Sequence, residues 1–297
     1  MTNRQTEARH PQAIGLDLKP DADILALLAS GQADAAQCVA TASPAIAQGA
    51  ELAAEALRKG GRLVYAAAGS SGLMALADAL ELPGTYGIER HRIEILLAGG
   101  AEALRDMRGG PEDDAQAATK DTEALNLSAN DCLIAVTASG QTPYPLAAVD
   151  VARAAGARTI GIANNAGAPL FAKVDAAICL PTPAEVIAGS TRMGAGTAQK
   201  IALNMLSTLM AVHLGHVHDG YMVNVIADNE KLRGRACGIV AAIAGVEEAA
   251  ARAALELSAG AVKPAVLIAR GAPDLEMALS ILLRNDGHLR RSLTELN

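Results

Sequence analysis

Two short loops rich in glycine, serine and threonine are the part of this sequence best suited to binding chemistry. Residues 68–72 read AGSSG and follow an apolar run at 63–67, and residues 138–142 read ASGQT and follow a second such run. A loop of small residues between a buried strand and a helix exposes backbone N–H groups at the positive end of the helix dipole. The repeated pattern predicts one phosphorylated small molecule held between the two loops.

Two common nucleotide motifs are missing. The chain contains neither GxxxxGKS/T nor GxGxxG. The first motif cradles the phosphates of nucleoside triphosphates and the second approaches the pyrophosphate of dinucleotides. The sequence therefore argues against both kinds of ligand.

Two carboxylates stand beside turn-forming residues and are candidates for acid–base chemistry. Glu81 precedes the sequence LPG at 82–84, where we expect the helix after the first loop to end, and Glu112 follows GGP at 109–111. Both acids are expected on loops at the mouth of the site. Two carboxylates in one pocket can act as acid and base when their surroundings separate their pKa values. A surface acid that caps a helix is the more common interpretation of either residue.

A histidine-rich segment, HLGHVHD at 213–219, is the one candidate for metal binding. Its spacing matches no standard zinc pattern, and Gly215 and Gly220 indicate a helix end and a turn. We expect no metal here. The polar run 228–232 includes Lys231, which could reach an anion, although such a run also commonly starts a helix.

Short apolar runs alternate with helical patterns through the middle of the chain. The expected strands are 62–67, 93–97, 132–137, 159–163 and 176–180. Such alternation is typical of βαβ units. It predicts an α/β fold with a doubly wound, five-stranded parallel sheet and a ligand site at its switch point.

Three regions are expected along the chain. Residues 1–60 are expected to form helices that pack on the core, with a break near residue 33. Residues 61–236 are expected to form the sheet domain. The alanine-rich residues 237–297 are expected to form a small helical domain. A long helix at about 193–214 is apolar on nearly every face and is expected to be buried, in part against another subunit.

The composition excludes several classes of partner. The net charge is −7, with no basic run, and aromatic residues make up 2% of the chain, which argues against nucleic acid. The N-terminal sequence MTNRQTEARHPQ lacks a signal-peptide core, and no apolar run is long enough to span a membrane. The four cysteines include no CxxC pair. We expect a cytoplasmic protein with buried thiols.

Together these segments resemble the N-acetylmuramic acid 6-phosphate etherases, a family with the sugar isomerase (SIS) fold, which is flavodoxin-like. The similarity spans nearly the whole chain. The segments that carry it are TEARHP at 6–11, AGSSG at 68–72, ELPGTYG at 81–87, ASGQTPY at 138–144, IAGSTR at 187–192, AGTAQK at 195–200 and NEKL at 229–232.

The resemblance implies a lyase that cleaves the D-lactyl ether of its amino-sugar phosphate by elimination and then hydration. It implies that Glu81 is the acid and Glu112 the base. It also implies a cytoplasmic homodimer with a shared active site, no metal and no redox cofactor. The implied substrate- and phosphate-binding residues are Ser70, Ser71, Gly72, Ser139, Gln141, Thr142, Glu185, Ser190, Asn229 and Lys231.

Three positions depart from the family pattern. Leu73, Gln141 and Gly194 stand where the family usually has a cation. A related sugar phosphate is therefore an alternative substrate. A non-catalytic sugar-phosphate regulator of the same fold would be expected to lack Glu81 and Glu112, and an aldose–ketose isomerase would lack the segments at 189–200 and 229–232.

Overall fold

The computed structural model of the chain describes residues 5–296, which form two compact units. One unit contains the chain up to Ala79 together with His91–Ser207, and the other contains Leu80–Arg90 together with the chain from Thr208 onward. The domain boundary expected at 236/237 falls inside helix α7 (Glu230–Ala244).

The first unit is built on the expected five-stranded sheet. All neighbouring strands are parallel, and their order is β2-β1-β3-β4-β5. The strands are β1 (Leu63–Ala67), β2 (Ile93–Leu97), β3 (Cys132–Val136), β4 (Arg158–Ala163) and β5 (Ala176–Cys179). This is the flavodoxin-like doubly wound order, with its switch point between β1 and β3. The predicted fold class is confirmed.

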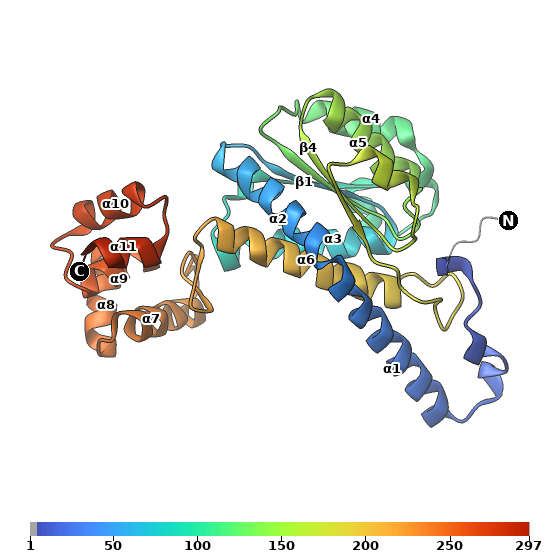
Figure 1. Cartoon of the computed structure of the whole chain (residues 1–297), viewed down its shortest axis with the longest axis horizontal. Helices are drawn as coiled ribbons and strands as arrows, with labels where there is room; N and C mark the ends of the chain where they lie inside the picture. The colour runs from blue at the N-terminus through green and yellow to red at the C-terminus, as the bar shows by residue number, and fades with distance from the viewer. Residues whose placement is uncertain (1–4, 297) are drawn as a thin grey trace. The chain divides into compact units, whose positions relative to one another are not determined.

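Helices cover both faces of the sheet (Figure 1). Val64 and Leu133 share one hydrophobic cluster with α4 (Ala115–Ala124) and α5 (Pro143–Ala154). The other face packs against α2 (Ser43–Arg58) and α6 (Gly194–His213). A Cβ on Gly49 of α2 would lie 3.2 Å from Leu206 of α6 and 3.4 Å from Ile160 of β4, so the missing side chain permits this close packing. Because both faces are buried, the strands are continuous apolar runs.

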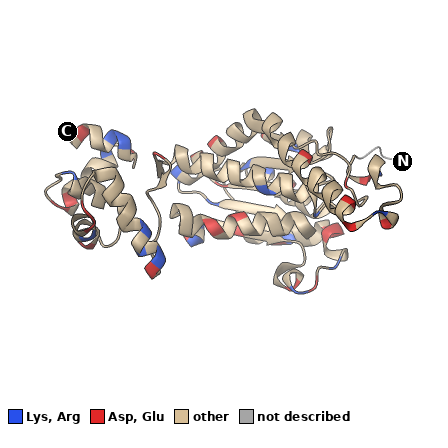
Figure 2. Cartoon of the chain, turned by 90° about the horizontal axis from the view of Figure 1, so that it is seen from below, with Lys and Arg blue, Asp and Glu red and all other residues tan. Residues whose placement is uncertain are grey.

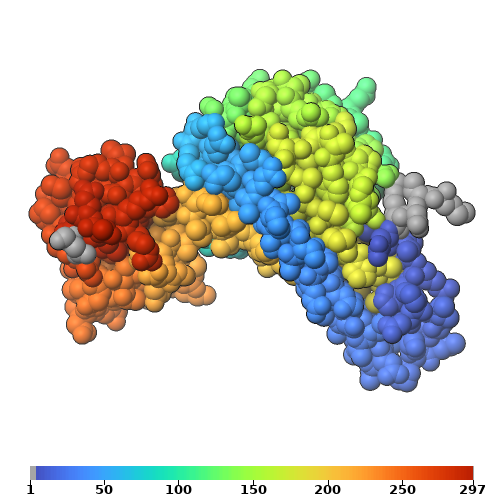
Figure 3. Space-filling model, in the orientation of Figure 1, coloured from blue at the N-terminus to red at the C-terminus, as the bar shows by residue number. Residues whose placement is uncertain are grey.

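Helix α1 (Asp21–Cys38) is one continuous helix, so the expected break near residue 33 is wrong. Gly31 lies within it, and a Cβ there would lie 3.2 Å from Val186. Glycine is therefore used for close packing rather than to end the helix. The helix extends beyond the sheet (Figures 1 and 3), and its one buried residue is Ala35. Leu25 on this helix is 64% exposed.

Helix α3 (Gly69–Tyr86) follows the first loop and continues past the point where we expected it to end. Pro83 lies inside the helix, so the helix continues although this residue has no N–H to donate. The helix ends at Gly87, which adopts the left-handed conformation (φ 64°) and donates its N–H to Pro83 O at 3.0 Å. Glu81 is therefore on a helix, roughly three turns from its start, and the expectation of a loop is wrong.

A buried carboxylate ties α3 to its neighbours. Asp78 on α3 is 5% exposed. Its Oδ2 accepts a hydrogen bond from Tyr65 Oη of β1 at 3.0 Å. Its Oδ1 accepts from Asn204 Nδ2 at 3.0 Å and from Ser207 Oγ at 2.9 Å, both on α6. Burial raises the pKa of Asp78 and these donors oppose that rise. One side chain thus connects a strand and two helices.

The second unit is helical, with one short hairpin. Strands β6 (Val217–His218) and β7 (Tyr221–Met222) are joined by Asp219 (φ 46°) and Gly220 (φ 80°), the conformation of a type I′ turn. The helices after the hairpin are α7, α8 (Glu248–Leu257), α9 (Val262–Ala269), α10 (Leu275–Arg284) and α11 (Leu289–Leu296). They enclose a second hydrophobic cluster.

The histidine-rich segment contacts other side chains of the second unit. His218 is buried, and its Nε2 lies 3.5 Å from Asp219 Oδ2. Asp219 also forms an ion pair with Arg290. Burial lowers the pKa of His216 to about 4. Within residues 5–296 no group of His, Cys, Asp or Glu is arranged to hold a metal ion. None of the described helices is both long and apolar enough to cross a membrane.

Replacing Asp78 tests the buried network. Asp78→Ala leaves two buried hydroxyls and the half-buried Asn204 amide without their acceptor, and we expect it to lower the free energy of unfolding by about 3 kcal/mol. Asp78→Asn keeps one acceptor oxygen and should cost about 1 kcal/mol. Urea denaturation followed by circular dichroism measures both values. Wild-type stability of the alanine variant would contradict the assigned role.

Candidate active site

The first predicted loop lies at the carboxyl end of β1, where α3 begins. Gly69 has a positive φ of 56°, which lets the chain turn sharply into the helix. A Cβ on Gly72 would lie 2.3 Å from Leu97 Cδ1 of β2, so any larger residue there would have to displace the Leu97 side chain. Ser70 is half-buried and Ser71 is 7% exposed. The loop presents two hydroxyls at the positive end of α3.

The second loop lies at the carboxyl end of β3 and forms a cluster of hydroxyls. The oxygens of Thr137 and Thr142 are 2.8 Å apart, and Ser139 Oγ lies 3.4 Å from each of them. Gln141 N donates to Ser139 Oγ at 3.2 Å. The turn depends on Gly140, whose φ is 68° and whose Cβ, if present, would lie 2.3 Å from Ala168 Cβ.

Both loops line one cavity of about 250 Å³. Ser70 and Ser71 line it from the first loop, and Ser139 and Thr142 line it from the second. Glu112 forms part of the same wall, on the short helix Gly110–Asp113. A Cβ on Gly69 would lie 3.7 Å from Glu112 Oε2, so this carboxylate sits over the start of α3.

The electrostatics of the cavity are unusual for an anion site. Among the described residues, no lysine or arginine lines it. Acidic and basic positions are interspersed over the helices (Figure 2). An anion in the cavity would therefore depend on hydroxyls, backbone N–H groups and the dipole of α3. Burial, and after it the Asp113 carboxylate, raises the pKa of Glu112 above that of an ordinary glutamate.

Several predicted site residues lie elsewhere. Glu81, Asn229 and Lys231 do not line the cavity and belong to the second compact unit. Glu81 and Lys231 are exposed on helices, and Asn229 caps α7 by accepting from Leu232 N at 3.0 Å. Their predicted contact with a substrate stays a prediction.

Glu185 and Ser190 lie on the segment that joins β5 to α6. Glu185 is buried, and its two oxygens accept from Gly194 N at 2.9 Å and Ala195 N at 2.8 Å, which caps α6. Ser190 stands between Gly189 and Thr191, which line the cavity. Glu185 therefore supports the start of α6, and its contact with a ligand stays a prediction.

Sequence reasoning missed the residues that line the cavity from the N-terminal segment. Thr6 and Glu7 form part of its wall, although residue 6 is far from both loops in the sequence. The only available signal was the segment TEARHP, which supported the family resemblance without suggesting a role.

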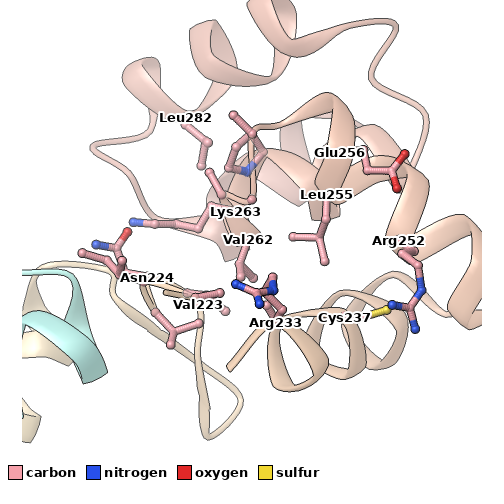
Figure 4. A pocket seen from close by; sticks show the side chains of 18 of the residues that line it. Val223, Asn224, Arg233, Cys237, Arg252, Leu255, Glu256, Val262, Lys263 and Leu282 are labelled. Atoms are coloured by element: carbon pink, nitrogen blue, oxygen red, sulfur yellow. The ribbon is translucent and has the colours of Figure 1, made fainter. Parts of the chain in front are cut away.

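A larger pocket of about 880 Å³ lies within the second unit (Figure 4). Its walls are mainly apolar, including Val223, Leu255 and Val262, and Arg233 and Arg252 also line it. None of the predicted site residues lines this pocket. The cavity between the two serine loops is therefore the candidate active site.

Comparison with known proteins defines the class and then the family. Residues 28–164 match the SIS domain, so the sheet with its paired serine loops is a SIS domain. A Deinococcus radiodurans protein named N-acetylmuramic acid 6-phosphate etherase is 45% identical over 98% of this chain and 96% of its own. Proteins of that name from Streptomyces avermitilis and Serratia proteamaculans are each 40% identical over 97% of this chain, and over 93% and 97% of their own.

Sequence identity of 40–45% over nearly the full length of both compared chains shows that they belong to one family. The chain belongs to the N-acetylmuramic acid 6-phosphate etherase family. The resemblance inferred from the sequence motifs is confirmed.

The contact at Gly140 gives a test of the second loop. Gly140→Ala forces a side chain into the left-handed region and into Ala168, whereas Gly167→Ala has a similar φ of 70° with nothing within 4 Å. We expect Gly167→Ala to lower the free energy of unfolding by about 1–2 kcal/mol, because of the backbone conformation alone. Gly140→Ala should lower it by about 1–3 kcal/mol more, because the added methyl group meets Ala168. Chemical denaturation compares them, and equal losses would contradict the proposed packing.

Proposed function

We propose that the protein is a carbon–oxygen lyase that cleaves the D-lactyl ether of N-acetylmuramic acid 6-phosphate. The products are N-acetylglucosamine 6-phosphate and D-lactate, a reaction of amino-sugar recycling. The observation that carries the proposal is the similarity, at 45% identity over 98% of the chain, to a protein named for this activity. A polar cavity that combines an anion cradle with a carboxylate is chemically suited to the reaction.

The phosphate of the substrate is assigned to the two serine loops. Hydroxyls of Ser70, Ser71, Ser139 and Thr142 would donate to its oxygens. Gly72 and Gln141 do not line the cavity, and their N–H groups donate to Ala68 O and Ser139 Oγ, so their predicted contact with the phosphate stays a prediction. Since no described cation lines the cavity, the binding energy of an arginine contact is missing. Each hydrogen bond to a charged group contributes about 1.5–3 kcal/mol. We therefore expect weaker phosphate binding than in relatives with arginine at positions 73 and 141.

Glu112 is assigned as the base. The proton on C2 is acidic when C1 is an aldehyde, in the open-chain form of the sugar, because the carbanion is then conjugated with the carbonyl. Glu112 would take this proton as the C2–C3 double bond forms and the C3–O bond breaks. The raised pKa of Glu112 makes it a stronger base than an exposed glutamate.

Glu81 is assigned as the acid. The departing lactyl oxygen would take its proton from Glu81, giving neutral D-lactate hydroxyl. Glu81 would then accept a proton from water as the hydroxide adds to C3, and the proton held by Glu112 would return to C2. Elimination and hydration together consume one water molecule and leave both carboxyl groups as they began.

A cytoplasmic homodimer with a shared active site completes the proposal. Glu81, Ser190, Asn229 and Lys231 are not among the residues that line the cavity of one chain, which leaves room for contributions from a second copy. Helix α1 carries apolar side chains that find little cover in one chain, since Leu25 is 64% exposed. Burial of such a face is the usual driving force for association.

The alternative of a non-catalytic regulator is less well supported. A sensor needs only to hold its sugar phosphate and has no use for a carboxylate with a raised pKa. Glu112 lies in the cavity with that property, which favours catalysis.

The direct test is release of D-lactate from N-acetylmuramic acid 6-phosphate by the purified protein. Loss of a general base or acid commonly costs a factor of 10² to 10⁴, so we expect Glu112→Gln and Glu81→Gln to lower kcat by at least about 100-fold. Glu102→Gln is the matched control, because Glu102 is exposed and outside the cavity. No lactate from the wild type would refute the etherase activity, and full activity of both variants would refute the acid–base assignment.

The pH profile offers a second test of Glu112. A base works only when deprotonated, so kcat/KM should fall as the pH falls through the pKa of Glu112. Asp113→Asn removes the neighbouring negative charge that helps to raise this pKa. The acidic limb should then move to lower pH, while Glu123→Gln, an exposed change on α4, should leave it in place. A shift in the opposite direction would exclude Glu112 as the titrating base.

A further inference from the structure

The N-terminal segment is anchored to the cavity wall by a buried residue. Thr6 is 1% exposed. Its Oγ1 accepts from Asn165 Nδ2 at 3.1 Å, and its N–H donates to Asn165 Oδ1 at 3.4 Å. Its carbonyl accepts from Gly189 N at 3.2 Å. Hydrogen bonds to Asn165 and Gly189, both distant in the sequence, thus fix the position of Thr6.

The same anchor is connected to the second serine loop. Asn165 Nδ2 also donates to Ala138 O at 3.0 Å, and Ala138 lines the cavity. Asn165 is itself 7% exposed. Hydrogen bonds through Asn165 therefore join Thr6 to the loop that would hold the phosphate. They also fix the backbone position of the next residue, Glu7.

That next residue, Glu7, places a second carboxylate on the cavity wall. A Cβ on Gly189 would lie 3.3 Å from Glu7 Oε2, which locates the carboxylate beside Gly189, another residue of the cavity wall. Within residues 5–296, no hydrogen bond or ion pair involves the Glu7 side chain. Both of its oxygens are available to a ligand.

The charge of Glu7 determines what it can bind. A carboxylate repels a phosphate and accepts hydrogen bonds from neutral O–H and N–H groups. The cavity already offers hydroxyls and a helix N-terminus for the anion. We propose that Glu7 is a specificity-determining residue that accepts hydrogen bonds from the neutral hydroxyl and amide donors of an amino-sugar phosphate, positioned by Thr6 and Asn165.

This role rests on the proposed function for the class of ligand, and it involves no chemical step. A residue that binds substrate and transition state equally raises KM when removed and leaves kcat unchanged. Glu7 should therefore distinguish a sugar phosphate from phosphate alone. A purely structural role, in which Glu7 holds the N-terminal segment in place, would affect both ligands alike.

The experiment compares two probes, N-acetylglucosamine 6-phosphate and inorganic phosphate, by isothermal titration calorimetry. Glu7→Ala should weaken binding of the sugar phosphate by about tenfold or more, because charge-assisted hydrogen bonds are lost. Glu7→Gln, which keeps an acceptor oxygen, should lie between the alanine variant and the wild type. Inorganic phosphate should bind both variants as tightly as the wild type, or more tightly, since a negative charge has been removed. Asp17→Asn, an exposed acid of the same segment, is the control and should change neither affinity.

Two outcomes would overturn the proposal: unchanged affinity for the sugar phosphate in Glu7→Ala, or equal losses for both probes. Its failure is distinguishable from that of the etherase activity. Sugar-phosphate binding that depends on Glu7, without lactate release, would support Glu7 and refute the activity. Lactate release with a wild-type KM in Glu7→Ala would support the activity and refute the role of Glu7.

Discussion

The candidate site depends on the register between two neighbouring parallel strands. Ala67, the last residue of β1, pairs with Val136, the last residue of β3. Because the two strands end at the same level, the loops that follow them open at one edge of the sheet, side by side. After β1 the chain continues to β2 on one side of the sheet, and after β3 it continues to β4 on the other side. The two connections therefore diverge at this switch point, which leaves space for a ligand between them. A shift of one residue in this pairing would move the serines apart and destroy the cradle.

The strands and the two loops were predictable from the sequence because each depends on local pattern. Buried parallel strands are unbroken apolar runs, and glycine with serine after such a run is typical of an anion loop. The end of α3 was not predictable in this way. The LPG sequence at 82–84 suggested a turn, yet the helix continues through Pro83, and the stop signal is Gly87 instead.

The cavity wall contributed by the N-terminal segment could not be predicted for a different reason. Thr6 meets Asn165 across 159 positions of sequence, and neither residue type signals such a contact. Glu185 illustrates the same limit, since nothing in the neighbouring sequence indicated that its carboxylate caps α6. Pairings over long distances are decided by packing of the whole sheet domain. Local periodicity carries no information about them.

The anchoring of Thr6 has a practical consequence for handling the protein. Thr6 and Glu7, close to the first described residue, form part of the wall of the candidate site. Removal of Thr6 and Glu7 would take away that part of the wall, although neither residue belongs to the hydrophobic core of the sheet. Because Asn165 joins Thr6 to Ala138 of the second serine loop, the effect of such a change would extend to that loop. Kinetic work therefore calls for a preparation in which Thr6 and Glu7 are intact.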